Sequence, residues 1–374
     1  MTAYIIRRLL LMIPTLLGIL LVSFAIIQFV PGGPVERLIA ELQGHGVEAT
    51  ARIGGGGAAG GDFASGAAGT AGGSDTYRGA QGLDPEFIAE LEALYGFDKP
   101  AHERFVLMVG NYLIFDLGES YYRDISVTDL VLEKMPVSIS LGLWSTLIIY
   151  LISIPLGIHK AVRDGQAFDV WTSAVIFIGY AIPSFMFAIL LIILFAGGRY
   201  WDIFPLGGLQ SEEFREMSAW ACTVSAGCVL DYLKHMILPV TAMVIGGFAS
   251  LTMLTKNSFL DEINKQYVLT ARAKGLSERR VLYSHVFRNA MLIVIAGFPA
   301  AFLSIFFTGS LLIEIIFNLD GLGLLGYESI INRDYPVVLG TLYIYSLMGL
   351  VMALIRDVVY VVVDPRIDFE ARRA

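Results

Sequence analysis

Six apolar segments recur along this sequence, and each is close to the ~20 residues that a helix needs to cross the hydrocarbon core of a bilayer. The chain is 56% hydrophobic and only 16% charged, whereas soluble domains carry roughly 25% charged residues. The sequence therefore predicts an all-α polytopic membrane protein with six transmembrane helices. The predicted spans are 9–30, 137–158, 171–195, 236–254, 290–313 and 337–355.

The segment 31–135, between the first two spans, carries most of the acidity. It holds sixteen acidic and seven basic residues, while the whole chain has a formal net charge of −8. Within it, 53–73 is almost entirely Gly and Ala, which is typical of a flexible insert. The pattern from Asp84 to Gly96 has an N-cap residue, an apolar stripe and a glycine stop, and predicts a short amphipathic helix. We therefore expect 84–135 to form a small helical cap.

These patterns divide the chain into four parts. The expected parts are an N-terminal end with the first span (1–30), an extramembranous region (31–135), a core with the other five spans (136–363) and a short tail (364–374).

Basic residues are distributed unevenly among the short loops. Lys160 and Arg163 lie between the second and third spans, and Arg366 follows the sixth. The segment 256–289, between the fourth and fifth spans, has seven basic residues against three acidic ones. Because loops rich in Lys and Arg stay in the cytoplasm, we expect both termini and this segment to be cytoplasmic, and 31–135 to face outward.

The basic segment 256–289 also has the pattern of a rigid elbow. A short helix predicted at 266–274 ends at Gly275, whose missing side chain permits a left-handed turn, and Ser277 is expected to cap a second helix. Two helices joined by a sharp turn transmit a push from a soluble partner as rigid-body movement. The alternative is that the charges only set the orientation and touch anionic lipid.

Catalytic patterns are missing from the sequence. It has no Walker-type phosphate loop, no pair of histidines with zinc-ligand spacing and no Gly-x-Ser-x-Gly motif. No acid or histidine falls near the centre of a predicted span, which argues against an intramembrane protease or a proton-driven transporter. We therefore expect a chain that is not an enzyme and that receives its energy from outside.

Prolines fall within or at the edge of every predicted span. Kinked helices suit a moving pathway, although Pro and Gly are also common in static membrane helices. The polar side chains of Ser184, Ser304 and Thr308 are candidates for lining such a pathway.

The chain has only two cysteines, Cys222 and Cys228, in a loop expected to face outward. They could bridge there, but a single pair of thiols is more often free, and we expect no disulfide.

The residues Tyr267 to Ser277, YVLTARAKGLS, resemble the cytoplasmic loop signature of binding-protein-dependent ABC importer permeases, in the form of the dipeptide and oligopeptide branch. Aligned on Gly275, Leu269 stands where the general signature has Glu, so the role of that carboxylate is not carried over. The resemblance covers most of the chain and includes Tyr95-Gly-Phe-Asp-Lys-Pro100, Asp116-Leu-Gly-Glu-Ser120, Arg333-Asp-Tyr-Pro336 and Asp364-Pro-Arg366. The Gly/Ala insert and the segments LGLWSTLIIYLISIPLGI, FAILLIILFAGG and LTKNSFLDEINKQY are similar to YejB-type permeases of microcin C and oligopeptide importers.

The resemblance implies the type I ABC importer permease fold, with a large periplasmic insertion after the first helix, in the inner membrane of a Gram-negative bacterium. It also implies a coupling helix that sits in a groove of an ATPase, where Arg272 and Lys274 could pair with acidic residues of that partner. The residues assigned to coupling are Thr270, Ala271, Arg272, Ala273, Lys274, Gly275, Leu276 and Ser277.

The implied partners are a second homologous permease, two ABC ATPase subunits or domains, a periplasmic peptide-binding protein and membrane lipid, without nucleic acid. ATP and Mg are expected in the ATPase, and no cofactor or metal in this chain. The 84–135 cap would help seat the binding protein, or would only shield the outer mouth. Alternatives for the function are a channel or scaffold that needs no ATPase, and an ABC permease for a non-peptide cargo such as nickel chelates.

Overall fold

The computed structural model describes residues 2–29, 99–123, 125–198, 200–215, 219–307 and 311–363. The insert 53–73, the helix predicted between Asp84 and Gly96 and the tail 364–374 lie outside these residues. In the described part every regular element is a helix, apart from an isolated antiparallel bridge between Glu119 and Ser126. The predicted all-α class is confirmed for this part of the chain.

Four of the described helices are long and apolar enough to cross a membrane: α1 (Thr2–Phe29), α5 (Val127–Val162), α10 (Ala226–Ile263) and α17 (Tyr335–Val363). Two bent pairs, α6 (Ala167–Ala181) with α7 (Ser184–Phe195) and the helices from Glu278 to Phe302, raise the number to six if each pair is one span. The described helices thus provide four to six candidate spans.

The predicted span 171–195 is not one straight helix, because α6 and α7 meet at a 93° bend. The break is at Pro183, which lacks an N–H group and disfavours helical geometry in the residue before it. Ile182 accordingly has an extended backbone, with φ −85° and ψ 120°.

The chain divides into two compact units. Unit 1 contains Met1–Arg8, Lys134–Leu324 and Met348–Ala374, and unit 2 contains Leu9–Glu133 and Leu325–Leu347.

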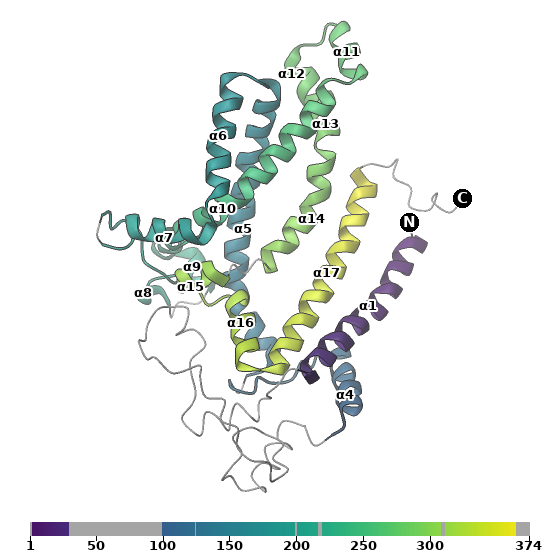
Figure 1. Ribbon diagram of the computed structural model, residues 1–374, viewed down its shortest axis with the longest axis vertical. Helices are drawn as coiled ribbons and strands as arrows, with labels where there is room; N and C mark the ends of the chain where they lie inside the picture. Colours follow the sequence, from purple (N-terminus) through teal and green to yellow (C-terminus); the bar gives the residue numbers. More distant parts are fainter. Residues whose placement is uncertain are drawn as a thin grey trace, which may run out of the picture. The chain divides into compact units, whose positions relative to one another are not determined.

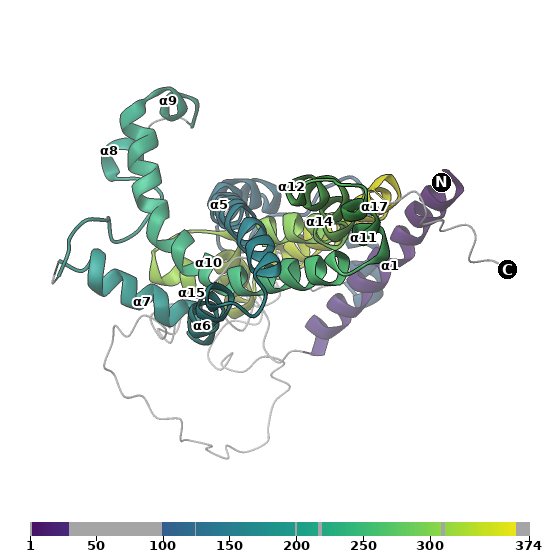
Figure 2. The same ribbon diagram turned by 90° about the horizontal axis from the view of Figure 1, so that it is seen from above.

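Unit 1 is built around α5, α6 and α10, which lie side by side (Figure 1). Close approach of α5 and α10 depends on Gly157, where an added Cβ would lie 2.6 Å from the Cβ of Thr255. The short helices α11 (Gln266–Ala273) and α12 (Glu278–Arg280) lie at one end of this unit, whereas α7 and α9 (Ala219–Val224) lie at the other (Figure 1). Figure 2 shows α9 and α8 (Glu212–Arg215) projecting to one side of α5 and α6.

The end of unit 1 away from α11 has its own apolar core. Buried residues of α5, α7 and α10 pack there with α15 (Leu311–Ile316) and the turn after it. These side chains include Leu141, Met236, Leu238, Ile313 and Phe317.

Unit 2 contains α4 (Ala101–Leu113) and most of α16 (Leu322–Asn332). The ring of Tyr112 in α4 lies 5.2 Å from the ring of Tyr343. Ser120 donates a 2.5 Å hydrogen bond to the carboxylate of Asp334. Aromatic packing and buried hydrogen bonds therefore both stabilise this unit.

The structure joins Cys222 and Cys228 in a disulfide, so the expectation of free thiols was wrong. The chain turns at Ser225, whose N–H donates to the carbonyl oxygen of Ala221 at 3.2 Å and of Cys222 at 3.0 Å. This turn brings the Cα atoms of the two cysteines to 5.2 Å, within the usual range for a disulfide.

The charge pattern suggested that Lys160 and Lys256 are loop residues, but both lie in helices. Lys160 lies in α5 and is 0% exposed, and Lys256 lies in α10 and is 9% exposed. Both helices continue beyond their apolar stretches, so these lysines are buried where α5 and α10 meet α6. Their charges are balanced by Asp164 and Asp169.

Candidate functional site

The helix α11 begins within three residues of the end of α10. Glu262, near the end of α10, pairs with Lys265 and accepts a 2.7 Å hydrogen bond from the hydroxyl of Tyr267. Burial raises the pKa of Tyr267, and the hydrogen bond to Glu262 raises it further. The tyrosine therefore stays neutral and fixes the direction in which α11 leaves α10.

One face of α11 is anchored in the protein. Val268 and Ala271 are buried in an apolar cluster with Phe259 of α10 and with Val281 and Val286 beyond the turn. Ala271, assigned from the sequence to the coupling surface, thus packs inward. The helix is therefore held against α10 as a rigid body rather than attached as a free loop.

Gly275 ends α11, as predicted, with a left-handed backbone at φ +79°. Its N–H donates to the carbonyl of Arg272 at 2.9 Å, and the N–H of Leu276 donates to that of Ala271 at 3.4 Å. These are the two hydrogen bonds of a Schellman turn. An added Cβ at Gly275 would meet open space, so the position needs glycine for its backbone conformation and not for room.

A salt bridge closes the turn from the outside. The guanidinium of Arg272 makes two hydrogen bonds to the carboxylate of Glu278, at 2.9 Å and 3.1 Å. Arg272 is thus held by its own loop, whereas Lys274 is exposed. Since both ends of this ion pair are exposed, it contributes only about 0–1 kcal/mol and acts mainly on the geometry.

Beyond the turn, Ser277 is the N-cap residue of α12, but its side chain makes no capping hydrogen bond, in contrast to the prediction. Its carbonyl accepts from Val281 at 2.9 Å instead. The chain continues as a π-helix, η1 (Val281–Val286), then as α13 (Phe287–Ala290) and α14 (Leu292–Phe307). Single π-helical turns occur frequently at functional sites.

The outer face of α11 is uncovered. Leu269 is 54% exposed, and Thr270, Ala273 and Lys274 are exposed around it. A cavity of about 240 Å³ opens between α5, α10 and η1, and Arg272 of α11 and Tyr283 are among its lining residues. An exposed leucine among small and basic side chains suits the docking of another protein.

The structure brings the predicted coupling residues into one turn, but it does not assemble the predicted pathway residues. Ser184 is partly buried and begins α7, directly after the 93° bend. Ser304 lies in α14, but its side chain is outside the described part, and so is Thr308.

Sequence reasoning did not foresee the contacts by which Glu262, Tyr267 and Glu278 hold the elbow in shape. For the two acids the signal was their place within a basic segment, which read only as a charge balance. The pairing of each acid depends on turns that spacing alone does not reveal.

The family described as "Binding-protein-dependent transport system inner membrane component" matches residues 153–369, which include the whole elbow. The chain is 60% identical over 372 residues to the "Peptidoglycan transport system permease protein YejB" of Agrobacterium fabrum, covering 100% of both chains. It is 58% identical over 372 residues to the "Inner membrane ABC transporter permease protein YejB" of Escherichia coli O157:H7, again covering 100% of both.

A more distant relative is the "Oligopeptide transport system permease protein AppB" of Bacillus subtilis, 33% identical over 99% of this chain and 100% of that one. The family match and the full-length similarity agree with the loop signature around Gly275. The chain therefore belongs to the binding-protein-dependent transport system inner membrane components, the permease subunits of ABC transporters.

Proposed function

We propose that this chain is the inner-membrane permease of a peptide importer and that α11 receives the movement of an ATPase. The observation that carries this proposal is the elbow itself: α11 is anchored through Val268 and Ala271, turned at Gly275, and uncovered around Leu269. An ATPase dimer that closes on ATP would push α11, and the push would pass through α10 and α14 into the spans.

The proposed assembly contains a second homologous permease, two ATPase subunits or domains that bind ATP and Mg, and a periplasmic peptide-binding protein. The family description, with its binding-protein-dependent transport, supports a partner of the last kind. This chain would hydrolyse no ATP. Ser184, Ser304 and Thr308 remain the proposed polar residues of the pathway.

The names of the relatives support a cargo that contains peptide, because they mention peptidoglycan and oligopeptide transport. Microcin C remains a proposed cargo within that class. Competition of uptake by defined peptides, with a nickel chelate as the non-peptide comparison, separates the cargo classes.

The disulfide supports the orientation proposed from the basic loops. Disulfides persist in the periplasm and are rare in the cytosol. Cys228 lies in the first turn of α10 and Ile263 at its end, and a helix of this length is about 57 Å long at 1.5 Å per residue, more than the ~30 Å hydrocarbon core. If α10 spans the membrane, α11 is then cytoplasmic.

Purification of the complex from its native membrane in mild detergent tests the proposal. We expect a second permease and an ATPase to co-purify, and peptide uptake into proteoliposomes to require ATP and a peptide-loaded binding protein. A chain that purifies without an ATPase and conducts peptide without ATP would instead support the channel alternative.

A further inference from the structure

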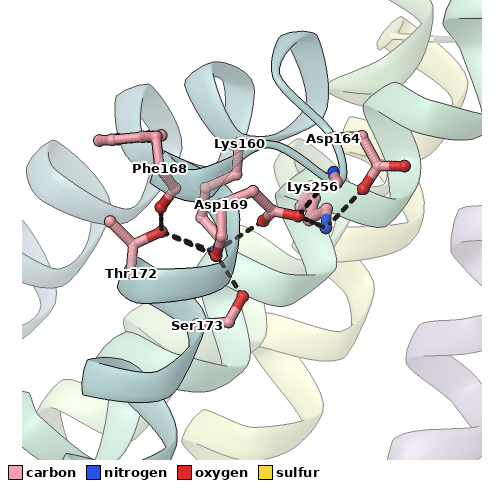
Figure 3. A network of polar contacts seen from close by, with 8 residues as sticks. Lys160, Asp164, Phe168, Asp169, Thr172, Ser173 and Lys256 are labelled. Carbon is pink, nitrogen blue, oxygen red and sulfur yellow. Dashed lines mark hydrogen bonds and ion pairs between the residues drawn. The ribbon is translucent and has the colours of Figure 1, made fainter.

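A network of four charged side chains, three of them buried, joins α5, α6 and α10 near the elbow (Figure 3). It contains Lys160, Asp164, Asp169 and Lys256, two cations and two anions, so it is electrically balanced. Neither the loop signature nor the family match assigns a role to it.

Lys160 is the fixed centre of this network. Its ammonium group donates to the carbonyl oxygen of Asp169 at 2.9 Å and to the hydroxyls of Thr172 at 2.9 Å and Ser173 at 2.7 Å. It also lies 2.9 Å from the carboxylate of Asp169. A lysine that is fully buried and has this many partners holds the first turn of α6 against the end of α5.

Lys256 joins this pair of helices to α10. Its ammonium group lies 2.7 Å from Asp169 and 2.8 Å from Asp164, which belongs to the turn between α5 and α6 (Figure 3). The N–H of Gly165 in the same turn donates to Asp169 at 3.2 Å. Lys256 is therefore the only member of the network that α10 contributes, and the one that bridges to both aspartates.

Lys256 lies on α10 seven residues before the helix ends, and α11 begins three residues beyond that end. Nearby, Gly157 of α5 packs against Thr255 of α10. A displacement of α11 reaches both α10 and α5, which share an apolar cluster with it, and the contacts between α10 and α6 offer a path onward to α6. An ion pair across this junction resists their separation more than apolar contacts alone, because pulling it apart exposes charges that are otherwise paired.

We propose that Lys256 is a positioning residue for transport: its pair with Asp169 locks α10 to α6, so that movement of α11 also moves α6 and α7, the two halves of the broken span. This inference rests on the proposed ATP-driven function. It adds a specific link between the elbow and α6, a helix that lies outside the elbow.

Lys256→Met is the variant that isolates this role. Methionine keeps much of the aliphatic length, Asp169 remains paired with Lys160, and Asp164 is 52% exposed and can be hydrated. Substitution of Lys160 would instead leave the fully buried side of the network without its cation, so it is a folding control. Asp164→Asn is the matched control for transport, because it leaves the pair between Lys256 and Asp169 intact.

The experiment uses the whole importer in proteoliposomes and measures peptide uptake and ATP hydrolysis in the same sample. For K256M we expect an assembled complex that hydrolyses ATP, with the uptake per ATP reduced about tenfold, a size common for coupling between sites. We expect K256R to restore most of this ratio and D164N to leave it near the wild-type value.

An unchanged uptake per ATP in assembled K256M would overturn the proposal, and so would a loss confined to complex yield or melting temperature. If K256M does not assemble, the uptake per ATP is measured for Lys256→Gln, which keeps a donor for Asp169. A reduced value supports the proposal, and an unchanged value overturns it. Failure of both variants to assemble would also overturn it, since Lys256 would then serve folding rather than coupling. Failure of the proposed function is distinguishable, because it would appear in the wild-type complex as uptake without ATP.

Discussion

Ser258 of α10 donates a 2.5 Å hydrogen bond to the backbone carbonyl oxygen of Ala290, the last residue of α13. The helices before and after Met291 are bent by 50° at this place. A bend of this size frees carbonyl groups from the helix, and the Ser258 hydroxyl satisfies one of them. The contact therefore holds α10 to the bend through which the elbow continues into α14.

Replacement of Ser258 by alanine tests the role of this contact. Ala290 is buried, so its carbonyl oxygen loses a partner that water does not easily replace, and we expect a loss of about 1 kcal/mol in the free energy of unfolding. Thermal unfolding in detergent measures it. Ser250→Ala on the same helix, at an exposed position, is the control and should change little. Equal losses in the free energy of unfolding for the two variants would show that the hydrogen bond to Ala290 does not stabilise the protein.

Gly157→Ala tests the close crossing of α5 and α10. The new Cβ would lie 2.6 Å from the Cβ of Thr255 and 2.9 Å from the carbonyl oxygen of Thr252. Since one of these contacts is to backbone, we expect overpacking to cost about 1–3 kcal/mol. Gly246→Ala, where a Cβ meets nothing within 4 Å, should be neutral or slightly stabilising, because alanine favours helix. The idea fails if the two variants melt at the same temperature.

Glu314 is 0% exposed in α15, and it accepts a 2.6 Å hydrogen bond from the N–H of Leu324. Burial raises the pKa of its carboxyl group, an effect that the backbone donors of Leu324 and Gly323 partly offset. With a raised pKa the folded state favours the protonated form. Its stabilising contribution is complete below the pKa of the unfolded chain and is lost as the pH rises through the pKa of the folded chain.

Glu314→Gln should therefore flatten the pH dependence of the melting temperature, because the amide is neutral throughout and still offers an acceptor to Leu324. Glu314→Ala removes that acceptor and should cost about 1–3 kcal/mol. Melting curves of the three proteins from acid to neutral pH check this. The same slope in wild type and E314Q would mean that Glu314 does not titrate in this range.

Gly275 separates the effect of backbone conformation from the effect of space. Its φ of +79° is strained for most residues, although an added Cβ would be free of contacts. Asparagine tolerates this region far better than a β-branched residue does. We therefore expect Gly275→Asn to retain most of the ATP-driven uptake and Gly275→Val to lose most of it, with peptide capture by the binding protein unchanged. Equal uptake by both variants would show that transport does not depend on the left-handed turn at Gly275.

The sequence was most informative where one residue type decides the local structure. Apolar length predicted the membrane helices, Gly275 predicted a left-handed turn, and Pro183 was among the prolines expected to interrupt the spans. In each case the physical cause acts within a few residues along the chain.

The sequence was least informative where the partner of a side chain is distant or depends on a turn. Lys256 reads as one more positive charge, and only the packing of α6 on α10 brings Asp169 to it, 87 positions away. Cys222 and Cys228 became a disulfide because the chain turns at Ser225. These contacts follow from the tertiary fold, which spacing does not encode locally.

Site-specific cross-linking tests the central claim most directly. The only two cysteines of the chain form a disulfide, so Thr270→Cys introduces a single free thiol on the exposed face of α11. Leu206→Cys is the matched control, since Leu206 is also exposed and lies between α7 and α8, where Phe204 and Leu209 pack against the apolar core shared with α7 and α15.

With a short photoactivatable cross-linker on the purified importer, we expect T270C to capture the ATPase, with a yield that changes on addition of ATP, and L206C to capture none of it. The account in which the ATPase binds to α11 would be contradicted if L206C captured the ATPase and T270C did not, or if both captured it equally.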